Sequence, residues 1–128
     1  MNILDENVSV IQQQLLRSWR ISIRHIGYDI GRKGMADEEI IPFLLTLRRP
    51  TFFTLDADFY TPALCHARYC LVFLDTSRQE CAHFVRRLMK HSLLDTQAKR
   101  MGAVIRVSHS GLFVWQLHAQ AELPLSWE

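Results

Sequence analysis

The spacing of apolar positions changes twice in the first 26 residues. Residues 1–4 form a short apolar run that predicts a buried strand. Between residues 8 and 19, apolar side chains recur at the intervals of one helix face, and Asp5 or Asn7 would cap this helix. The side chains on that face are Val8, Ile11, Leu15, Leu16 and Trp19. Residues 20–26 then alternate polar and apolar side chains, which predicts a second strand.

Three glycines within residues 27–34 predict a loop before the next helix. This second helix begins at Ala36 or Asp37, with Pro42 in about its first turn, where a missing N–H costs least. Its apolar positions are Ile40, Ile41, Phe43, Leu44 and Leu47. Residues 51–55 are β-branched and aromatic, which predicts a third strand.

The second half of the chain continues this alternation and then changes character. Residues 70–75 form a continuous apolar run typical of a buried parallel strand. Residues 77–94 predict a helix capped by Ser77. Its inward side chains would be Cys81, Phe84, Val85, Leu88 and Met89. Residues 102–117 alternate around Ser-His-Ser-Gly, which predicts a C-terminal β-hairpin. The whole pattern predicts one α/β domain over residues 1–128, with a mainly parallel sheet and helices on both faces.

Composition excludes several classes of protein. A hydrophobic content of 48% with 22% charged residues argues against disorder. No apolar run reaches the length of a membrane span, and the acidic start does not resemble a secretion signal, so we expect no membrane partner. The three cysteines are an odd number without CxxC spacing. Idle thiols in a reducing cytoplasm explain them better than a disulfide framework or a zinc site.

Charge is distributed unevenly behind the net value of +2. Residues 81–110 contain one acid, Asp95, whereas most other acids lie in the first 60 residues. The bases of this segment are Arg86, Arg87, Lys90, Lys99, Arg100 and Arg106. A chain with an acidic part and a basic part can hold a cation in one place and a polyanion in the other.

Pairs of acids follow predicted strands or begin a predicted helix. They are Asp5 and Glu6 after the first strand, Asp37 and Glu38 at the start of the second helix, and Asp56 and Asp58 after the third strand. The carboxyl ends of parallel strands and the starts of crossover helices meet at one edge of a sheet. Carboxylates gathered there would repel one another, and Mg²⁺ or Mn²⁺ removes that repulsion. A metal-bound water can then attack a phosphodiester.

Each of these pairs also has an ordinary structural explanation. The acids after the first strand suit a helix cap, those of the second helix complement its dipole, and those after the third strand form turns. The coincidence of all three pairs at one edge favours a metal site.

Three segments resemble the compact PIN-like nuclease domains, relatives of the toxin ribonucleases of bacterial toxin–antitoxin modules. They are LDEN, ADEEI and TLDADF, which lie in consistent order within about residues 1–60. The resemblance implies a three-layer α/β/α sandwich that binds Mg²⁺ or Mn²⁺ and cleaves RNA as an endonuclease. By position, it implies the metal ligands Asp5, Glu6, Asp37, Asp56 and Asp58, and the catalytic residues Asp5, Glu38, Asp56 and Asp58. Leu55 departs from the pattern, because many relatives have a basic residue there.

The resemblance also implies partners. A toxin of this kind acts with a protein antitoxin, and a homodimer is plausible. For the RNA substrate, the candidate phosphate contacts are Arg32 and Lys33 in the glycine-containing loop and Arg86, Arg87 and Lys90 on the later helix. A solvated helix face and an ordinary basic loop would explain the same residues.

Two other functions compete with the ribonuclease. A non-catalytic PIN-like module would use the hairpin or the basic helix to bind a protein or nucleic acid. A receiver-type phosphoacceptor domain would use Asp56 after the third strand. Such a domain needs a lysine after its fifth strand, where this chain has Val107-Ser108-His109.

Overall fold

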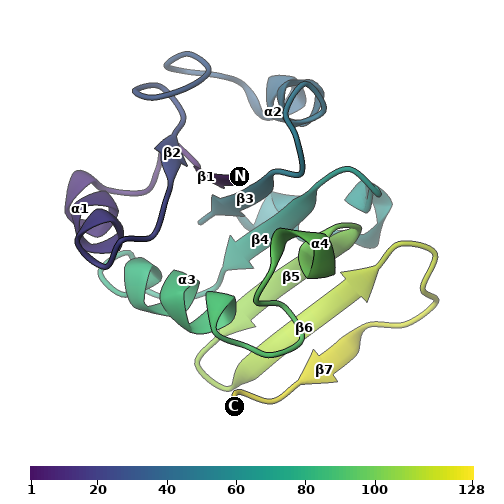
Figure 1. Cartoon of the computed structure of the whole chain (residues 1–128). Helices are drawn as coiled ribbons and strands as arrows, with labels where there is room; N and C mark the ends of the chain where they lie inside the picture. The colour runs from purple at the N-terminus through teal and green to yellow at the C-terminus, as the bar shows by residue number, and fades with distance from the viewer.

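A seven-stranded sheet in the order β2-β1-β3-β4-β5-β6-β7 organises the chain (Figure 1). The computed structural model describes all of residues 1–128. The strands are β1 (Asn2–Leu4), β2 (Arg24–His25), β3 (Thr51–Thr54), β4 (Cys70–Leu74), β5 (Ala103–Ser108), β6 (Gly111–Gln116) and β7 (Leu123–Leu125). Strands β1 to β5 pair in parallel, whereas β6 and β7 pair antiparallel with their neighbours. The predicted α/β class is confirmed, with a mixed sheet.

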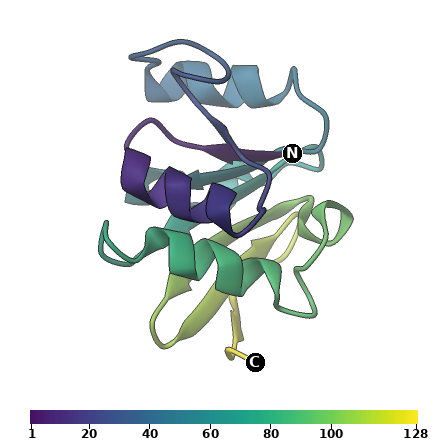
Figure 2. The ribbon, with the colours of Figure 1, turned by 60° about the vertical axis from the view of Figure 1, so that its left-hand side comes forward.

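Four α-helices and two short 3-10 helices connect the strands. They are α1 (Val10–Ser18), α2 (Asp37–Leu44), α3 (Cys81–Met89), α4 (Gln97–Arg100), η1 (Ala57–Phe59) and η2 (Pro62–Leu64). Figure 2 shows α1 and α3 side by side, with α2 across the strands from both. None of the helices combines the length and apolarity that a bilayer crossing requires.

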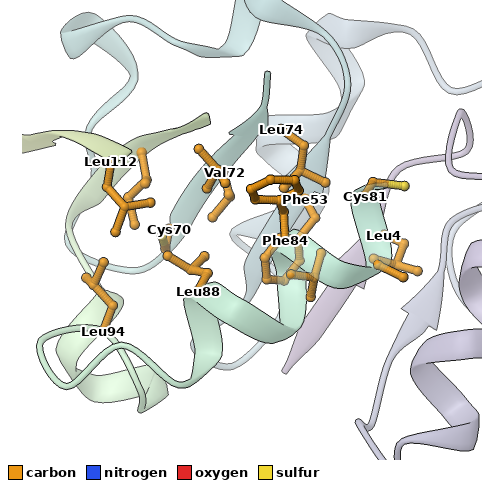
Figure 3. Packing of buried hydrophobic residues seen from close by; sticks show 14 of the residues in the cluster. Leu4, Phe53, Cys70, Val72, Leu74, Cys81, Phe84, Leu88, Leu94 and Leu112 are labelled. Carbon is orange, nitrogen blue, oxygen red and sulfur yellow. The ribbon is translucent and has the colours of Figure 1, made fainter. Parts of the chain in front are cut away.

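Successive side chains of each strand point to opposite faces of the sheet and therefore belong to two separate hydrophobic cores. On one face, α3 places Phe84 and Leu88 against Phe53 and Val72 (Figure 3). On the other face, the α2 side chains Ile40 and Leu44 pack on Ile3, Phe52 and Leu71. The sheet is therefore buried on both faces at β1, β3 and β4.

The connection from β4 through α3 to β5 has the opposite hand from the connection between β1 and β2. Both helices lie on the same face, but the chain crosses the sheet in opposite directions. About 98% of parallel crossovers are right-handed, so one of these two connections is unusual. The consequence is that α3 packs beside α1, and no α-helix lies on the other face of β5 and β6. There Arg106 and Phe113 remain partly exposed.

The start of α1 corrects the predicted cap and part of the predicted inward face. Ser9 caps the helix, its hydroxyl oxygen accepting the Gln12 N–H at 3.4 Å, instead of Asn7 or Asp5. Ile11 was expected to face inward but is 68% exposed, whereas Gln12 and Gln13 are buried. The helix is rotated from the orientation that the apolar spacing favours, because the two glutamines have specific partners within the protein.

The other helix boundaries also differ from the sequence pattern. Pro42 is the sixth residue of α2 and not in its first turn. Helix α3 begins at Cys81, with Glu80 in the cap position, and the hydroxyl of Ser77 instead donates to the Glu80 carboxylate at 2.7 Å. The second strand is limited to two residues. Strand β7 has no counterpart among the predicted elements, because Pro124 interrupts the apolar pattern of residues 123–125.

Candidate metal centre

Three aspartates meet at the carboxyl edge of the sheet. Asp37, Asp56 and Asp58 each offer a carboxylate oxygen, and these oxygens all lie within 4.8 Å of one another. Asp37 is the first residue of α2, and the other two follow β3 directly. Sequence segments about 20 residues apart thus bring three oxygen ligands into one place. Carboxylate oxygens are the ligands that Mg²⁺ and Mn²⁺ prefer.

A turn after β3 fixes the two later aspartates. The Asp56 carboxylate accepts the backbone N–H of Asp58 at 2.9 Å, and so caps the short helix η1. The backbone N–H of Asp56 in turn donates to the Thr54 hydroxyl at 3.0 Å. Asp56 is partly buried, while Asp58 is exposed. One Asp56 oxygen is therefore used by the turn, and the other remains available to a ligand.

The cap of α2 leaves the Asp37 carboxylate free. Ala36 occupies the cap position, and its backbone N–H donates to the Glu39 carboxylate at 3.2 Å. Glu39 therefore accepts the hydrogen bond from the cap residue, and the Asp37 carboxylate is not needed for it. Asp37 sits in the first turn, where the helix dipole favours a negative charge, and points to the other two aspartates.

Asp5 lies beside the three aspartates without belonging to the closest group. Its carboxylate accepts the Thr54 hydroxyl at 2.6 Å and the Glu6 backbone N–H at 2.7 Å. Burial raises the pKa of Asp5, these hydrogen bonds oppose the rise, and the charges of Asp56 and Glu6 add to it. The side chain is thus held in place and harder to ionise than an exposed aspartate.

The electrostatics of Asp37 reflect the crowding of acids. Partial desolvation raises the pKa of its carboxyl group, and the neighbouring charges of Asp56, Asp5 and Asp58 raise it further. Because Asp37 is exposed, the repulsion from its neighbours is the contribution that a bound cation would cancel. The crowding acts on Asp37, and its carboxylate, together with the other two, offers oxygen ligands suited to a divalent ion.

The predicted ligand Glu6 faces another part of the molecule. Its carboxylate accepts the backbone N–H of Gly34 at 2.8 Å, which ties the end of β1 to the loop before α2. Glu38 is exposed on α2 and lines two hollows, one on either side of that helix, of about 570 and 330 Å³. The smaller hollow is also lined by Asp37 and Asp58, so Glu38 lies next to the three aspartates.

The predicted basic residues lie away from the aspartates or have partners of their own. Arg32 forms an ion pair with Glu39, and the Lys33 ammonium lies 4.9 Å from the centre of the Tyr28 ring. On α3, the Arg86 guanidinium stacks 3.8 Å from the Trp19 ring centre and that of Arg87 4.3 Å from Trp127.

Lys90 lies at the far end of α3, beside a small hollow of about 140 Å³. Because α3 begins near the carboxyl edge and runs away from it, its second half leads towards the opposite edge. The structure therefore does not bring Arg86, Arg87 or Lys90 next to the acids.

Two further residues contribute to this edge: Thr54, which has no role in the sequence prediction, and Arg106, which the sequence marks only as one of the bases of residues 81–110. Thr54 is buried and links Asp5 to Asp56 through one hydroxyl. Arg106 of β5 is in register with Phe73 of β4, which is in register with Thr54. Two strand spacings separate Thr54 from Arg106, about 10 Å, on the same face of the sheet. Arg106 also pairs with Asp75 at 3.1 Å and stacks 4.2 Å from the Phe113 ring centre.

Comparisons with protein-family models, with curated proteins and with solved structures found no match. Any functional proposal for the chain rests on its own residues and geometry.

The Thr54 hydroxyl gives a first prediction. Replacing Thr54 by Val keeps the side-chain shape but removes the donor to Asp5 and the acceptor of the Asp56 N–H. We expect the free energy of unfolding to fall by about 1–3 kcal/mol, the typical cost of unpaired buried polar groups. Urea unfolding of Thr54→Val and Thr54→Ser measures this, and serine should recover most of the loss. A Val variant as stable as the wild type would show that the hydroxyl does not hold the two aspartates.

The raised pKa of Asp37 predicts that Asp37→Asn stabilises the metal-free protein. The folded state binds the Asp37 proton more tightly than the unfolded state. Wild-type stability therefore decreases as pH rises from the ordinary value of 3.8 through the raised pKa. Asparagine does not titrate. In EDTA we therefore expect the free energy of unfolding of Asp37→Asn to equal that of the wild type at about pH 4 and to exceed it by on the order of 0.5 kcal/mol at pH 7, after solvent screening.

Thermal unfolding at several pH values measures this advantage. Asp95 supplies a control of opposite sign, because its hydrogen bond from Lys99 lowers the pKa of its carboxyl group. Asp95→Asn should lose stability relative to the wild type as pH rises. Equal pH profiles for Asp37→Asn and wild type would contradict the repulsion described above.

Proposed function

We propose that the protein is a divalent-metal-dependent endoribonuclease. The observation that carries the proposal is the convergence of Asp37, Asp56 and Asp58 within 4.8 Å at the carboxyl edge of a parallel sheet. Open α/β sheets bind their ligands at this edge. The resemblance of three sequence segments to PIN-like nucleases supports RNA as the substrate.

The three aspartates would hold Mg²⁺ or Mn²⁺, with Asp5 beside them. The donor set fits such an ion, because it consists of carboxylate oxygens whose mutual repulsion a divalent charge relieves. When bound, the metal supplies an activated water and stabilises the negative charge that develops on a phosphodiester. Thr54 orients Asp5, and the turn at Asp56 fixes the ligands before substrate arrives.

Glu38 and Arg106 are assigned to the substrate side of the reaction. Glu38 is exposed beside the aspartates and forms no hydrogen bond or ion pair with another side chain, so its carboxylate is free to accept a proton from the attacking water. Arg106 lies on the same face and presents a guanidinium that can contact a neighbouring phosphate. Arg106 would make the phosphate contact that the sequence assigns to Arg86, Arg87 and Lys90, because those residues of α3 lie away from the acids.

The resemblance to toxin ribonucleases extends the proposal to the partners. A protein antitoxin would bind the chain in the cytoplasm and block cleavage, and the chain would form a homodimer. The sequence resemblance supports these points, and the hollows beside α2 offer space for a partner side chain.

The experiment that tests the function is cleavage of a mixed RNA pool by the wild-type protein with Mg²⁺, with Mn²⁺ or with chelator. Cleavage that requires metal supports the proposal. Calorimetric titration with Mn²⁺ on the same preparation separates the alternatives. A folded protein that neither cleaves RNA nor binds the cation is a binding module instead.

A phosphoacceptor domain is the second candidate, and one specific observation favours it. The parallel strands have the order 2-1-3-4-5, which is shared by flavodoxin and receiver domains. Asp56 then occupies the end of the third strand in sequence. The absence of a lysine after β5 counts against this function. Incubation with acetyl phosphate and mass measurement of the intact chain tests it, since phosphorylation adds a covalent group and cleavage does not.

A further inference from the structure

A hollow lined by three arginines lies at the edge of the sheet opposite the metal centre. Its volume is about 510 Å³, and its lining includes Arg48, Arg49 and Arg68 but no aspartate or glutamate. We call it the arginine hollow. The proposed ribonuclease does not use it, because the aspartates lie at the other end of the strands.

The position of the arginine hollow follows from the topology. Its lining comes from the segments that lead into β3, β4 and β5, at the amino ends of these strands. The metal centre follows the carboxyl end of β3. Strand β3 has four residues, so the two sites are separated by at least about 13 Å along the sheet. One ligand group cannot occupy both sites.

The positive charges around the arginine hollow are not neutralised within the protein. None of its three arginines forms an ion pair. The Arg68 guanidinium donates to the backbone carbonyl of Leu45 at 2.8 Å, which fixes its position, while Arg48 and Arg49 are exposed. Like charges gathered without acids repel one another, and a bound anion relieves that repulsion.

A fourth arginine, Arg100, adds a buried positive charge at this edge of the sheet. Arg100 is buried, and it donates to Thr51 at 3.0 Å and to the Leu94 carbonyl at 2.6 Å. No carboxylate lies within ion-pair distance of it. Its neighbours in sequence, Ala98 and Met101, both contribute to the lining of the arginine hollow. A buried cation is screened less by solvent than an exposed one, so its field reaches the arginine hollow.

The backbone at Arg49 is held in an uncommon conformation. Its φ is +46°, in the left-handed region that residues other than glycine seldom adopt. Pro50, which follows it, is buried. Such conformations persist where the surrounding structure enforces them, and they concentrate at ligand sites. The turn places two arginines consecutively at the mouth of the arginine hollow.

We propose that the arginine hollow binds the phosphate groups of a nucleotide. Guanidinium forks pair with phosphate oxygens in a bidentate manner, which a single ammonium cannot do. The apolar lining residues Leu47 and Met101 are partly buried and offer contact to the sugar or base. The phosphates come either from a free nucleoside di- or triphosphate or from the 5′-phosphate end of an RNA.

Isothermal titration with pyrophosphate and with ADP, both in EDTA, tests the proposal. EDTA removes divalent cations, so binding at the aspartates does not contribute. We expect both probes to bind the wild type and the double variant Arg48→Gln/Arg49→Gln to bind about tenfold more weakly or worse, because two charge-assisted contacts are lost. A matched control is Arg24→Gln/Arg78→Gln, which removes the same charge from two exposed arginines elsewhere. Its affinity should equal that of the wild type.

The outcomes decide both the site and the source of the phosphate. No binding of either probe, or equal weakening in the two double variants, overturns the proposal. Short RNAs with a 5′-phosphate or a 5′-hydroxyl separate the sources. A preference for the 5′-phosphate that disappears in Arg48→Gln/Arg49→Gln identifies an RNA end, and tighter binding of ADP than of the RNA identifies a free nucleotide. Cleavage at the metal centre is measured independently, so either proposal can fail alone.

Discussion

An Asp56→Asn variant is expected to lose metal-dependent RNA cleavage by about a hundredfold or more. Asp56 is the central residue of the site, since it contacts the turn to Asp58 and its charge acts on both Asp5 and Asp37. Asparagine keeps an oxygen that can accept the Asp58 N–H, so the turn after β3 remains. The substitution removes the negative charge of one of the three carboxylates that would hold the cation.

Cleavage rates of the same RNA pool, with Mg²⁺ and with Mn²⁺, measure this loss. Thermal unfolding in EDTA verifies that the variant is folded, and we expect it to be no less stable than the wild type, because a repelling charge is gone. Asp95→Asn is the matched control: it also removes one carboxylate, but from an exposed pair with Lys99 far along the chain. Full activity of Asp56→Asn in a clean preparation would refute a ribonuclease at this site.

The location of the acids was accessible from sequence because it depends on the ends of strands. Short apolar runs marked β1 and β3, and the residues after parallel strands fall on one edge whatever the details of packing. Which acids come closest depends on local hydrogen bonds. Glu6 turns to Gly34, and Glu39 takes over the cap that would otherwise occupy Asp37. No spacing rule expresses these choices.

Thr54 and Arg106 illustrate what the sequence pattern leaves out. Thr54 lies in a β-branched and aromatic run and Arg106 in an alternating segment, and the register between strands is what places both on the same face beside the acids. Register across a parallel sheet is set by the connections, which are long and unlike one another here. The basic helix α3 is conspicuous in sequence, but the face of the sheet on which it packs depends on the hand of the connection from β4 to β5, which places it beside α1.

Helix α1 contains a buried polar side chain that the apolar spacing does not predict. Apolar spacing selected Ile11 for the core, but Gln12 is buried in its place. The Gln12 carbonyl oxygen accepts the backbone N–H of Ala82 at 2.8 Å, and its amide donates to the Gln79 carbonyl at 3.0 Å. Helix α3 has no capping side chain of its own. A glutamine 70 residues earlier in the sequence therefore supplies its cap.

We expect Gln12→Leu to lower the free energy of unfolding by about 1–3 kcal/mol. Leucine fits the space roughly but leaves the buried Ala82 N–H without a partner, at about 1–3 kcal/mol, whereas Gln79 is exposed and its carbonyl can bond to water. Gln14→Leu is the matched control, since Gln14 lies on the exposed side of the same helix and should change stability by less than about 0.5 kcal/mol. Urea unfolding of both variants measures the difference. If the two substitutions had equal effects, the start of α3 would not depend on α1. A large difference would mean that a polar side chain helps to set how these two helices pack, in addition to the apolar contacts of Leu16.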